Sequence, residues 1–278
     1  MPHPDIEQID RRTWASGNYV RDYANRILRP VEVVFLARYG RALSGRTLEL
    51  GCGAGRVLGY MAQIANEAHG VDLSVRMVDY CRRTYPRAHV TQGDLADPMS
   101  YGTGAFDMIW LGDNVIDVLG DAERRRVLSA LRERLAREGV LIFSSHNLDA
   151  VEPPAGGSAA TGGNHRGPSQ AAQLIHRLST LTLAKGISRL RRTPARYRNR
   201  RRLAPLAYRS DRYAILNDEA HDYSLLHYYA RRDAQEDQLR ELGYTLLECL
   251  DTEGEPVARG QLSSDTELHY VARANSAE

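Results

Sequence analysis

The feature that most constrains the fold of this chain is a buried strand that runs directly into a series of glycines. Residues 47–56 read TLELGCGAGR, and Leu48 and Leu50 have the alternating spacing of a strand. The turn that follows contains three glycines, Gly51, Gly53 and Gly55. Glycine lets the backbone come close to a ligand because it has no Cβ atom. Together with the helical spacing of residues 57–64, this pattern predicts half of a βαβ unit, which binds its ligand at the strand's carboxyl end.

Strand-like and helix-like segments alternate as far as residue 145, and the alternation resumes after residue 230. The predicted strands are 46–50, 68–72, 88–92, 105–112, 139–145, 244–250 and 266–273. The predicted helices between them are 54–66, 74–84, 121–137 and 231–242. Residues 105–112 form a continuous apolar run, which is typical of a strand covered on both faces. The alternation predicts an α/β fold with a doubly wound, parallel sheet.

Periodicity and composition divide the chain into four segments. The first is predicted to be an N-terminal helical cap in which Pro30 separates two helices. The second is the ligand-binding α/β core. The third is an insertion, or lid, with a Gly-rich loop, a weakly amphipathic helix and an Arg-rich stretch, and the fourth completes the core. The four segments are 1–45, 46–150, 151–229 and 230–278.

Composition excludes several classes of protein. A chain of 278 residues, 42% of them hydrophobic, is long enough to bury one large core. No apolar run approaches the ~20 residues of a membrane-spanning helix, and the first residues are polar, so we expect a cytoplasmic protein. The three cysteines have neither paired nor metal-ligand spacing, so no disulfide framework and no metal site are predicted. Almost every base is arginine, which suggests a bacterial genome rich in GC.

Three carboxylates near the ends of predicted strands indicate which ligand the glycine turn holds. Glu49 lies just before the glycines, where it would attract an amino group and repel the pyrophosphate of an NAD-dependent oxidoreductase. Asp72 closes the second strand, where a carboxylate can accept hydrogen bonds from both ribose hydroxyls. Asp94 follows the third strand and can accept from an adenine amine, with Leu95 against the ring. An amino acid end, a ribose and an adenine in that order predict S-adenosylmethionine.

Five motifs extend this interpretation to a family. In chain order they are LELGCGAG, GVDLS, GDLAD, FDMIWLGDN and GVLIFSSHN. With this spacing, residues 46–147 resemble the class I S-adenosylmethionine-dependent methyltransferases, and residues 244–273 are similar to the reversed last hairpin of that family. The resemblance implies a Rossmann-like, doubly wound, seven-stranded sheet with an antiparallel last strand and an insertion after strand five.

The resemblance also implies which residues contact the cofactor. These residues are Glu49, Gly51, Cys52, Gly53, Asp72, Leu73, Met77, Asp94, Leu95, Leu111, Gly112 and Asp113. Within the family, WLGDN and SHNLD are similar to the glycine N-methyltransferase group, in which a tyrosine and an arginine of an N-terminal helix engage the cofactor. The corresponding residues here are Tyr19, also a candidate catalytic residue, and Arg26. The alternative is that Tyr19 and Tyr23 are aromatic residues of the core.

The sequence places further polar side chains where a methyl acceptor would bind. His146, just beyond the fifth strand, is a candidate base or substrate contact, although a structural role is the alternative. An arginine lies near this position in the glycine-methylating group, so His146 argues against an amino acid substrate. Asn114 and Asn147 are candidates to orient the acceptor by hydrogen bonds.

A second polar cluster, NDEAHDYSLLHYY, follows the insertion. The corresponding region builds the substrate wall in the family, and the candidate substrate-binding residues here are His221, Tyr223, His227 and Tyr229. A strand at this point would turn His227 and Tyr229 to one face. The alternative is an ordinary amphipathic segment with Leu225 and Leu226 in the core.

The predicted function is methyl transfer to a nitrogen or oxygen of a small molecule, in specialised metabolism. An RNA- or protein-directed methyltransferase is the alternative, because eleven Lys or Arg residues and one acid lie between Lys185 and Arg212. A solvated helix face would also explain these arginines, and nucleic acid is the less favoured partner. A third alternative is a cofactor-binding domain without catalysis. No membrane partner is expected, and a homodimer stays open.

Overall fold

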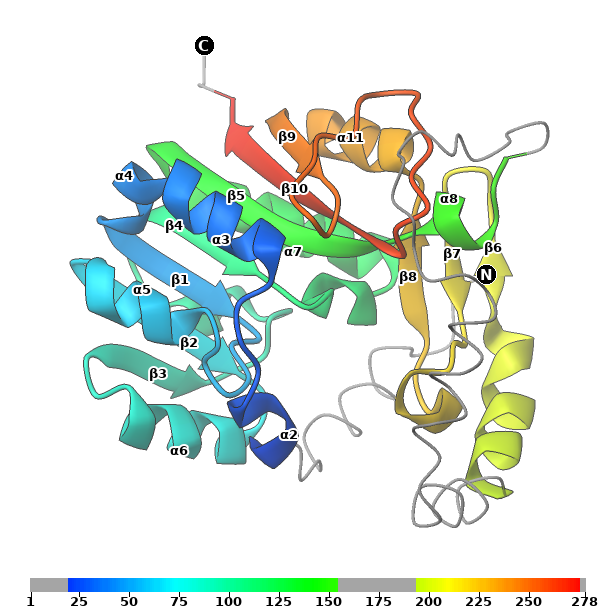
Figure 1. The fold of residues 1–278 in the computed structure, drawn as a ribbon, viewed down its shortest axis with the longest axis horizontal. Coiled ribbons are helices and arrows are strands. Elements are labelled where there is room, and N and C mark those ends of the chain that lie inside the picture. Colours follow the sequence, from blue (N-terminus) through cyan, green and yellow to red (C-terminus); the bar gives the residue numbers. More distant parts are fainter. Residues whose placement is uncertain (1–19, 155–193, 276–278) are drawn as a thin grey trace.

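A ten-stranded sheet runs through the residues that this computed structural model describes, 20–154 and 194–275. Its strands are β1 Arg46–Leu50, β2 Glu67–Asp72, β3 Ala88–Gln92, β4 Phe106–Leu111, β5 Leu135–Asn147, β6 Tyr208–Arg209, β7 Tyr213–Leu216, β8 His227–Ala230, β9 Tyr244–Leu250 and β10 Glu267–Ala274. The order is β3-β2-β1-β4-β5-β8-β7-β6, and β10 pairs with β5 and β9 (Figure 1). The strands β1 to β5 are parallel to one another, whereas β10 is antiparallel to β5.

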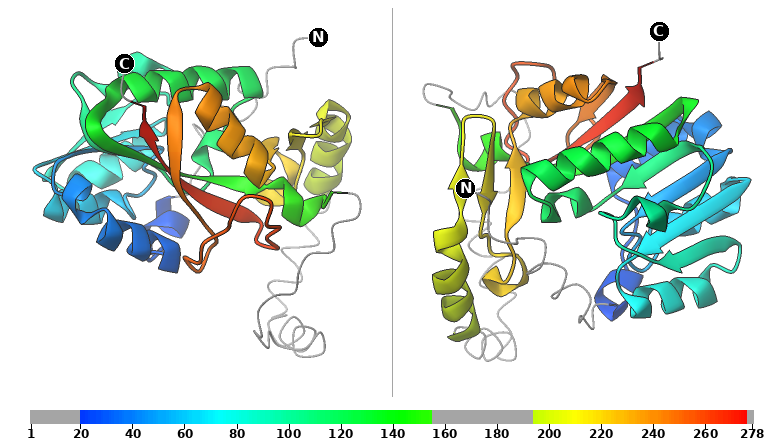
Figure 2. Two further views of the ribbon diagram at one scale, coloured as in Figure 1. Left: turned by 90° about the horizontal axis from the view of Figure 1, so that it is seen from above. Right: turned by 180° about the vertical axis from the view of Figure 1, so that it is seen from behind.

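Helices cover both faces of this sheet, as Figure 2 shows. The α-helices are α2 Val20–Ala24, α3 Pro30–Arg38, α4 Gly40–Leu43, α5 Leu58–Ile64, α6 Val75–Thr84, α7 Asp121–Arg134, α8 Leu148–Val151 and α11 Arg232–Glu241, with a further helix over residues 194–203. Short 3-10 helices are η1 Pro98–Tyr101, η2 Val115–Val118, η3 Ala204–Leu206 and η4 Ala220–Tyr223. The helices α3, α5 and α6 lie on one face, and α7 and α11 lie on the other.

The apolar run of β4 is explained by this double covering. Met108 and Trp110 belong to the core beneath α3 and α5, whereas Ile109 and Leu111 belong to the core beneath α7. All four side chains are at most 1% exposed. A parallel strand buried on both faces has no solvent side that would need polar residues.

The N-terminal helices are tied to the sheet by aromatic packing. Pro30 is the first residue of α3, where its missing N–H is not needed by the helix, so the predicted break lies at the start of this helix. Phe35 of α3 packs edge-on against Trp110 of β4, with 6.1 Å between the ring centroids. This contact fixes the chain that leads from α2 into α3 above the carboxyl ends of β1 and β4.

The order of the central strands determines where a ligand can bind. The chain adds β2 and β3 on one side of β1 and then crosses to place β4 and β5 on the other side. Loops that leave the carboxyl ends of β1 and β4 therefore diverge, which opens a crevice between them. In the register of these strands, Glu49 lies between Gly70 of β2 and Trp110 of β4.

The structure confirms the α/β class, the Rossmann-like doubly wound order and the antiparallel last strand. The predicted number of seven strands is too small, because β6, β7 and β8 extend the sheet from the segment predicted to be an insertion. His146 pairs with Glu267 of β10 on one side and with Tyr229 of β8 on the other, so β8 continues the sheet beyond the end of β4. The helix predicted from residue 54 begins at Leu58, because the glycine turn extends to that point.

Some predictions concern residues outside the described ranges. They include Tyr19, the helix at 171–184 and most of the Gly-rich loop. Within residues 20–154 and 194–275, no helix combines the length and the apolar character needed to cross a membrane.

Candidate functional site

A cavity of about 280 Å³ lies at the carboxyl ends of β1, β2 and β4. It is lined by residues of α2, the glycine turn, η2, β5 and β8 as well. The lining residues that the sequence predicted are Arg26, Glu49, Gly51, Cys52, Gly53, Asp72, Leu73, Met77, Asp94, Leu95, Gly112, Asp113, Asn114, His146 and His227. The three carboxylates that indicated a ligand in the sequence therefore meet at one cavity.

The turn after β1 has a backbone that requires glycine at its first position. Gly51 has a φ of +66°, and a Cβ atom there would lie 2.3 Å from Cγ2 of Val115. The amides of Gly51 and Cys52 both donate to the carbonyl oxygen of Val71, at 2.8 and 3.1 Å. These bonds turn the chain sharply at the end of β1, so the floor of the cavity is made of backbone.

Glu49 is a buried carboxyl group that lacks a partner for one of its oxygens. The residue is 5% exposed, and its Oε2 makes no hydrogen bond. Burial raises the pKa of Glu49 well above its usual value, although the positive charge of Arg56 opposes this shift. An unpartnered carboxyl oxygen in the wall of a cavity is suited to a cationic donor such as an amino group.

Asp72 and Asp94 are held in fixed orientations by backbone amides. The two carboxylate oxygens of Asp72 accept from the amides of Gly53 and Ser74, both at 2.8 Å. Burial raises the pKa of Asp72, and these two hydrogen bonds oppose the increase. One oxygen of Asp94 accepts from the amide of Ala96 at 2.8 Å. Each carboxylate oxygen retains a second lone pair, which can accept from a ligand hydroxyl or amine.

A network of arginines closes the cavity near the end of β4. Asp113 accepts from Arg26 at 3.1 Å and from Arg56 at 2.7 Å, and it also bonds Arg29. Asp113 and Asn114 have positive φ values of 51° and 55°, which non-glycine residues seldom adopt. Strained backbone of this kind persists where surrounding contacts hold it, and here the arginines supply those contacts.

Asp117 of η2 connects the buried core to the cavity wall. It has no exposed surface, and it pairs with Arg124 of α7, which is equally buried. The same carboxylate accepts from the hydroxyl of Ser145 at 2.8 Å, from the backbone amide of His146 at 2.6 Å and bonds the His146 ring at 2.7 Å. Burial alone would raise the pKa of Asp117, but Arg124 and His146 outweigh it, so the pKa is lowered.

The ionised state of Asp117 fixes the tautomer of His146. An ionised carboxylate only accepts hydrogen bonds, so Nδ1 of His146 carries the proton in the 2.7 Å contact. The other ring nitrogen, Nε2, then has a free lone pair when the ring is neutral. His146 lines the cavity, so this nitrogen is available to a bound molecule.

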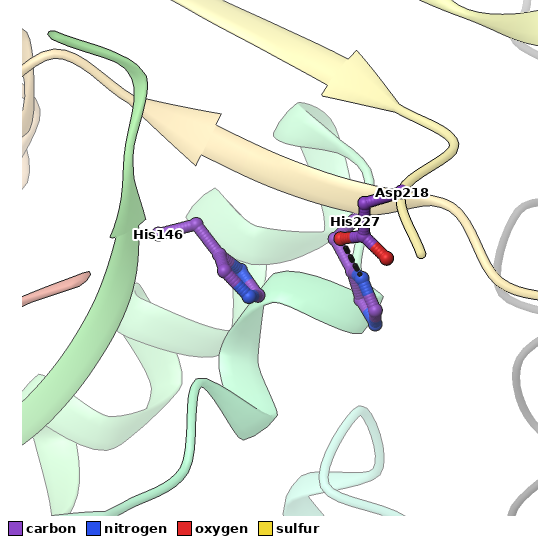
Figure 3. A group of neighbouring side chains, drawn as sticks. All are labelled: His146, Asp218 and His227. Atoms are coloured by element: carbon purple, nitrogen blue, oxygen red, sulfur yellow. Dashed lines mark hydrogen bonds and ion pairs between the residues drawn. The ribbon is translucent and has the colours of Figure 1, made fainter. Parts of the chain in front are cut away.

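His227 of β8 lies beside His146 in a matching arrangement. The two rings are stacked, with 5.0 Å between their centroids, and Nδ1 of His227 is 2.7 Å from Oδ2 of Asp218 (Figure 3). Asp218 also accepts from the hydroxyl of Tyr229 at 2.7 Å. The Tyr229 ring stacks on His146 with 4.7 Å between centroids. Two imidazoles, each with its own carboxylate, therefore form one end of the cavity.

The sequence of the central part of the chain matches a known family. Residues 47–139 match the family model described as "Methyltransferase domain". These residues contain the glycine turn and most of the cavity wall that β1, β2 and β4 supply. They are similar in sequence to methyltransferase domains.

Known proteins resemble this segment and the surrounding chain to different extents. A methyltransferase of Geobacillus sp. strain WCH70 is 30% identical over 115 residues, which is 40% of this chain and 47% of that protein. The chain spans about half the length of the curated relatives that it matches.

Solved structures confirm the fold over almost the whole chain. The CcbJ methyltransferase from Streptomyces caelestis has a TM-score of 0.58 at 17% identity, covering 95% of this chain and 99% of its own. The glycopeptide N-methyltransferase MtfA, determined with S-adenosyl-L-methionine, has a TM-score of 0.54 at 14% identity, covering 90% and 96%. The fold expected from the resemblance to class I methyltransferases is confirmed.

Several predicted site residues lie away from the cavity. Leu111 is part of the core beneath α7, because alternation along β4 turns it away from the cavity. Asn147 is buried and donates to the carbonyl oxygens of Ser263 and Asp265, so it anchors a loop instead of facing an acceptor.

The predicted substrate cluster is also only partly at the cavity. The hydroxyl of Tyr223 donates to Glu219 at 3.1 Å, and the Tyr223 ring does not line the cavity. Tyr229 supports His146 and Asp218 from behind and has no place in the cavity wall. The side chain of His221 is outside the described part of the structure. His227 is the member of the predicted cluster that reaches the cavity.

Sequence reasoning missed most of the groups that hold the site in position. They are Arg29, Arg56, Asp117, Arg124 and Asp218. A weak signal existed for Asp117, which is a lone acid within the apolar segment VIDVL. For Arg124 the sequence gives no signal, because an arginine in the run ERRR of a helix is normally exposed.

We expect Arg124→Ala to destabilise the protein strongly. Removing the guanidinium leaves the Asp117 charge buried without its main partner, and such a loss costs about 3–5 kcal/mol. Urea-induced unfolding followed by circular dichroism measures the change. Arg126→Ala is the matched control, because Arg126 lies on the same helix with a side chain that is 71% exposed. A similar, small effect of both substitutions would contradict the proposed importance of the buried pair.

Proposed function

We propose that this chain is a methyltransferase that uses S-adenosylmethionine to methylate a nitrogen or oxygen of a small molecule. The observation that supports it best is the meeting of Glu49, Asp72 and Asp94 at one cavity of a methyltransferase domain. When bound, S-adenosylmethionine supplies an electrophilic methyl group. The protein has to hold this group, orient the acceptor and exclude water.

Each carboxylate fits a different part of the cofactor. The unpartnered Oε2 of Glu49 would accept from the amino group of the methionine part. Asp72, already aligned by two amides, would accept from the ribose hydroxyls, and Asp94 from the adenine amine. Arg26 and Arg29 line the cavity near the end of β4, close to Asp113. Positive charge there is suited to the methionine carboxylate.

The acceptor would lie between the methionine end and the two histidines. His146 presents Nε2 to the cavity, and Asp117 stabilises the positive charge that the ring gains on accepting a proton. Asn114 is held by Glu267, to which its side-chain amide donates at 2.8 Å, while its Oδ1 has no hydrogen-bond partner. That oxygen is suited to a donor on the acceptor.

A small molecule is the acceptor that the enclosed site favours. The two histidines lie inside the wall of a cavity of about 280 Å³, and His227 is only 6% exposed. The second candidate is an RNA- or protein-directed enzyme, favoured by Tyr197 and Arg198 on the exposed surface of the helix over 194–203. Transfer of radiolabelled methyl groups into fractions of a bacterial extract separates the two. Label in RNA or protein rather than in small molecules would favour the second candidate.

Asp72→Asn should weaken cofactor binding at least tenfold. An amide cannot accept from two hydroxyls while keeping both backbone hydrogen bonds, because one of its ends is a donor. Calorimetric titration with S-adenosylmethionine measures the change. Glu67→Gln is the control on the same strand, since Glu67 is exposed and pairs with Arg46 away from the cavity. Equal affinities of the Asn variant and the wild type would contradict the proposed cofactor site.

Glu49→Gln should weaken cofactor binding by about 10- to 100-fold, the range expected for loss of one hydrogen bond to a charged group. The Glu49→Gln substitution should also stabilise the cofactor-free protein at higher pH. The pKa of Glu49 is higher in the folded protein than in the unfolded chain. The wild type therefore loses stability as pH rises from the pKa of the unfolded chain toward that of the folded protein.

The glutamine variant carries no such ionisation, so its melting temperature should increase relative to that of the wild type as pH rises above the ordinary pKa of a glutamate. Thermal unfolding at a series of pH values checks this, with Glu67→Gln as the control. If the difference in melting temperature between the variant and the wild type did not change with pH, the result would argue against a raised Glu49 pKa.

His146→Ala should lower the rate of methyl transfer by about 100-fold or more, which is the usual contribution of a positioned base. Affinity for S-adenosylmethionine should change little, because the carboxylates of β1 and β2 remain. His89→Ala is the control, since His89 lies on β3 outside the cavity. Transfer of radiolabel under single-turnover conditions separates chemistry from binding. An unchanged rate in the alanine variant would remove His146 from the mechanism.

A further inference from the structure

We propose that His146, His227 and Asp218 form a binding site for a divalent first-row transition metal ion such as Zn²⁺. One ring nitrogen of each histidine and one carboxylate oxygen of Asp218 lie within 4.8 Å of one another (Figure 3). Across residues 20–154 and 194–275, no other set of three such side chains is gathered this closely. Two histidines and one carboxylate are a recurrent ligand set for these metals, and the set leaves coordination positions open.

The surroundings of the three ligands resemble those of established metal sites. A metal-binding histidine usually donates its other ring N–H to a carboxylate, which fixes the ring and makes it a better ligand. Asp117 has this position behind His146, at 2.7 Å from Nδ1. Tyr229 donates to Asp218 at 2.7 Å and so orients the carboxylate. The nitrogen of His146 that stays free to coordinate is Nε2.

The contact between His227 and Asp218 is where a cation can replace a proton. Nδ1 of His227 and Oδ2 of Asp218 are 2.7 Å apart, so a proton is shared between them. A metal ion that bridged these atoms would displace that proton into solvent. Binding should therefore release protons and weaken as pH falls, which is normal for sites that contain histidine.

Only small side-chain movements are needed to complete the site. Ligands of one Zn²⁺ ion lie about 2.0–2.2 Å from the metal, hence about 3–3.5 Å from one another. The largest separation, up to 4.8 Å, must therefore contract by about 1.3–1.8 Å. The backbone is already in register, because His146 pairs with Tyr229, two residues from His227 on β8. Changes in the side-chain torsions of His227 and Asp218 would bring their ligand atoms toward His146, which Asp117 holds in place.

The position of the site suggests what the metal would do. His146 and His227 both line the cavity, so the open coordination positions would face the acceptor. A hydroxyl bound to a divalent cation loses its proton more easily, so an oxygen acceptor would need no proton transfer to His146. This consequence rests on the proposed methyl transfer, whereas metal binding itself does not.

Titration of the full-length, untagged protein tests the proposal. After treatment with a chelator and dialysis, Zn²⁺ binding is measured by calorimetry and Co²⁺ binding by its visible absorption spectrum. We expect one ion per chain and a histidine-type Co²⁺ spectrum without the charge-transfer band of a thiolate. His227→Gln and Asp218→Asn should each weaken binding at least tenfold, and the apparent affinity should fall with pH.

A second pair of histidines supplies the matched control. The rings of His69 and His89 are also close, with 5.2 Å between centroids, and Glu67 is 3.3 Å from His69. His89→Gln should therefore leave metal binding unchanged if the ion occupies the cavity. Circular dichroism and cofactor binding of each variant establish that it is folded.

The possible results separate the metal site from the proposed function. The proposal would be overturned if the wild type bound no metal. It would also be overturned if His227→Gln and Asp218→Asn both kept the wild-type affinity, or if His89→Gln lost metal binding. Metal binding without methyl transfer would leave the site standing and count against the proposed function. If the wild type bound no Zn²⁺ but the metal-free protein still transferred methyl groups, the metal site would be rejected and the proposed function would stand.

Discussion

The buried pair of Asp117 and Arg124 is the interaction on which the end of the cavity with the two histidines depends. A carboxylate without exposed surface is stable only when its oxygens are fully used, and here Arg124, Ser145 and His146 use them. Through these bonds η2, α7 and β5 are held in one arrangement. Asp117 therefore determines both the stability of the core and the orientation of the His146 ring. A change that disturbs one should also disturb the other.

The cofactor half of the cavity could be predicted because its residues are close in sequence to the elements that position them. Gly51, Asp72 and Asp94 each follow a strand directly, and parallel strands bring their carboxyl ends to the same edge. Residue type and strand order are then sufficient to predict which side chains share a cavity. The same reasoning failed for Leu111, where the alternation of β4 places the side chain in the core instead.

The end of the cavity that contains the two histidines could be predicted only in part: His146 and His227 were identified, but the geometry comes from contacts between distant segments. Asp218 is 72 positions from His146 along the chain, and β7 and β8, which bring them together, have four residues each. Strands this short carry little periodic signal. Their pairing also requires the end of β5 to extend past β4, which follows from the three-dimensional arrangement alone. The sequence predicted that His227 and Tyr229 would share a face, but it had no means to identify what they face.

The two histidines are supported in different ways, and this difference bears on the acceptor. Asp117 is locked into the core by Arg124, so His146 is held rigidly. Asp218 lies between β7 and η4, and it contacts His227 and Tyr229, both on β8. His227 is therefore positioned by the short strands β7 and β8, whereas His146 is positioned through the buried core. An imidazole held by the core suits a site in which the reacting atom must be placed accurately. In the proposed methyl transfer, His146 would set the position of the acceptor atom, and the β7–β8 segment would determine which molecules fit.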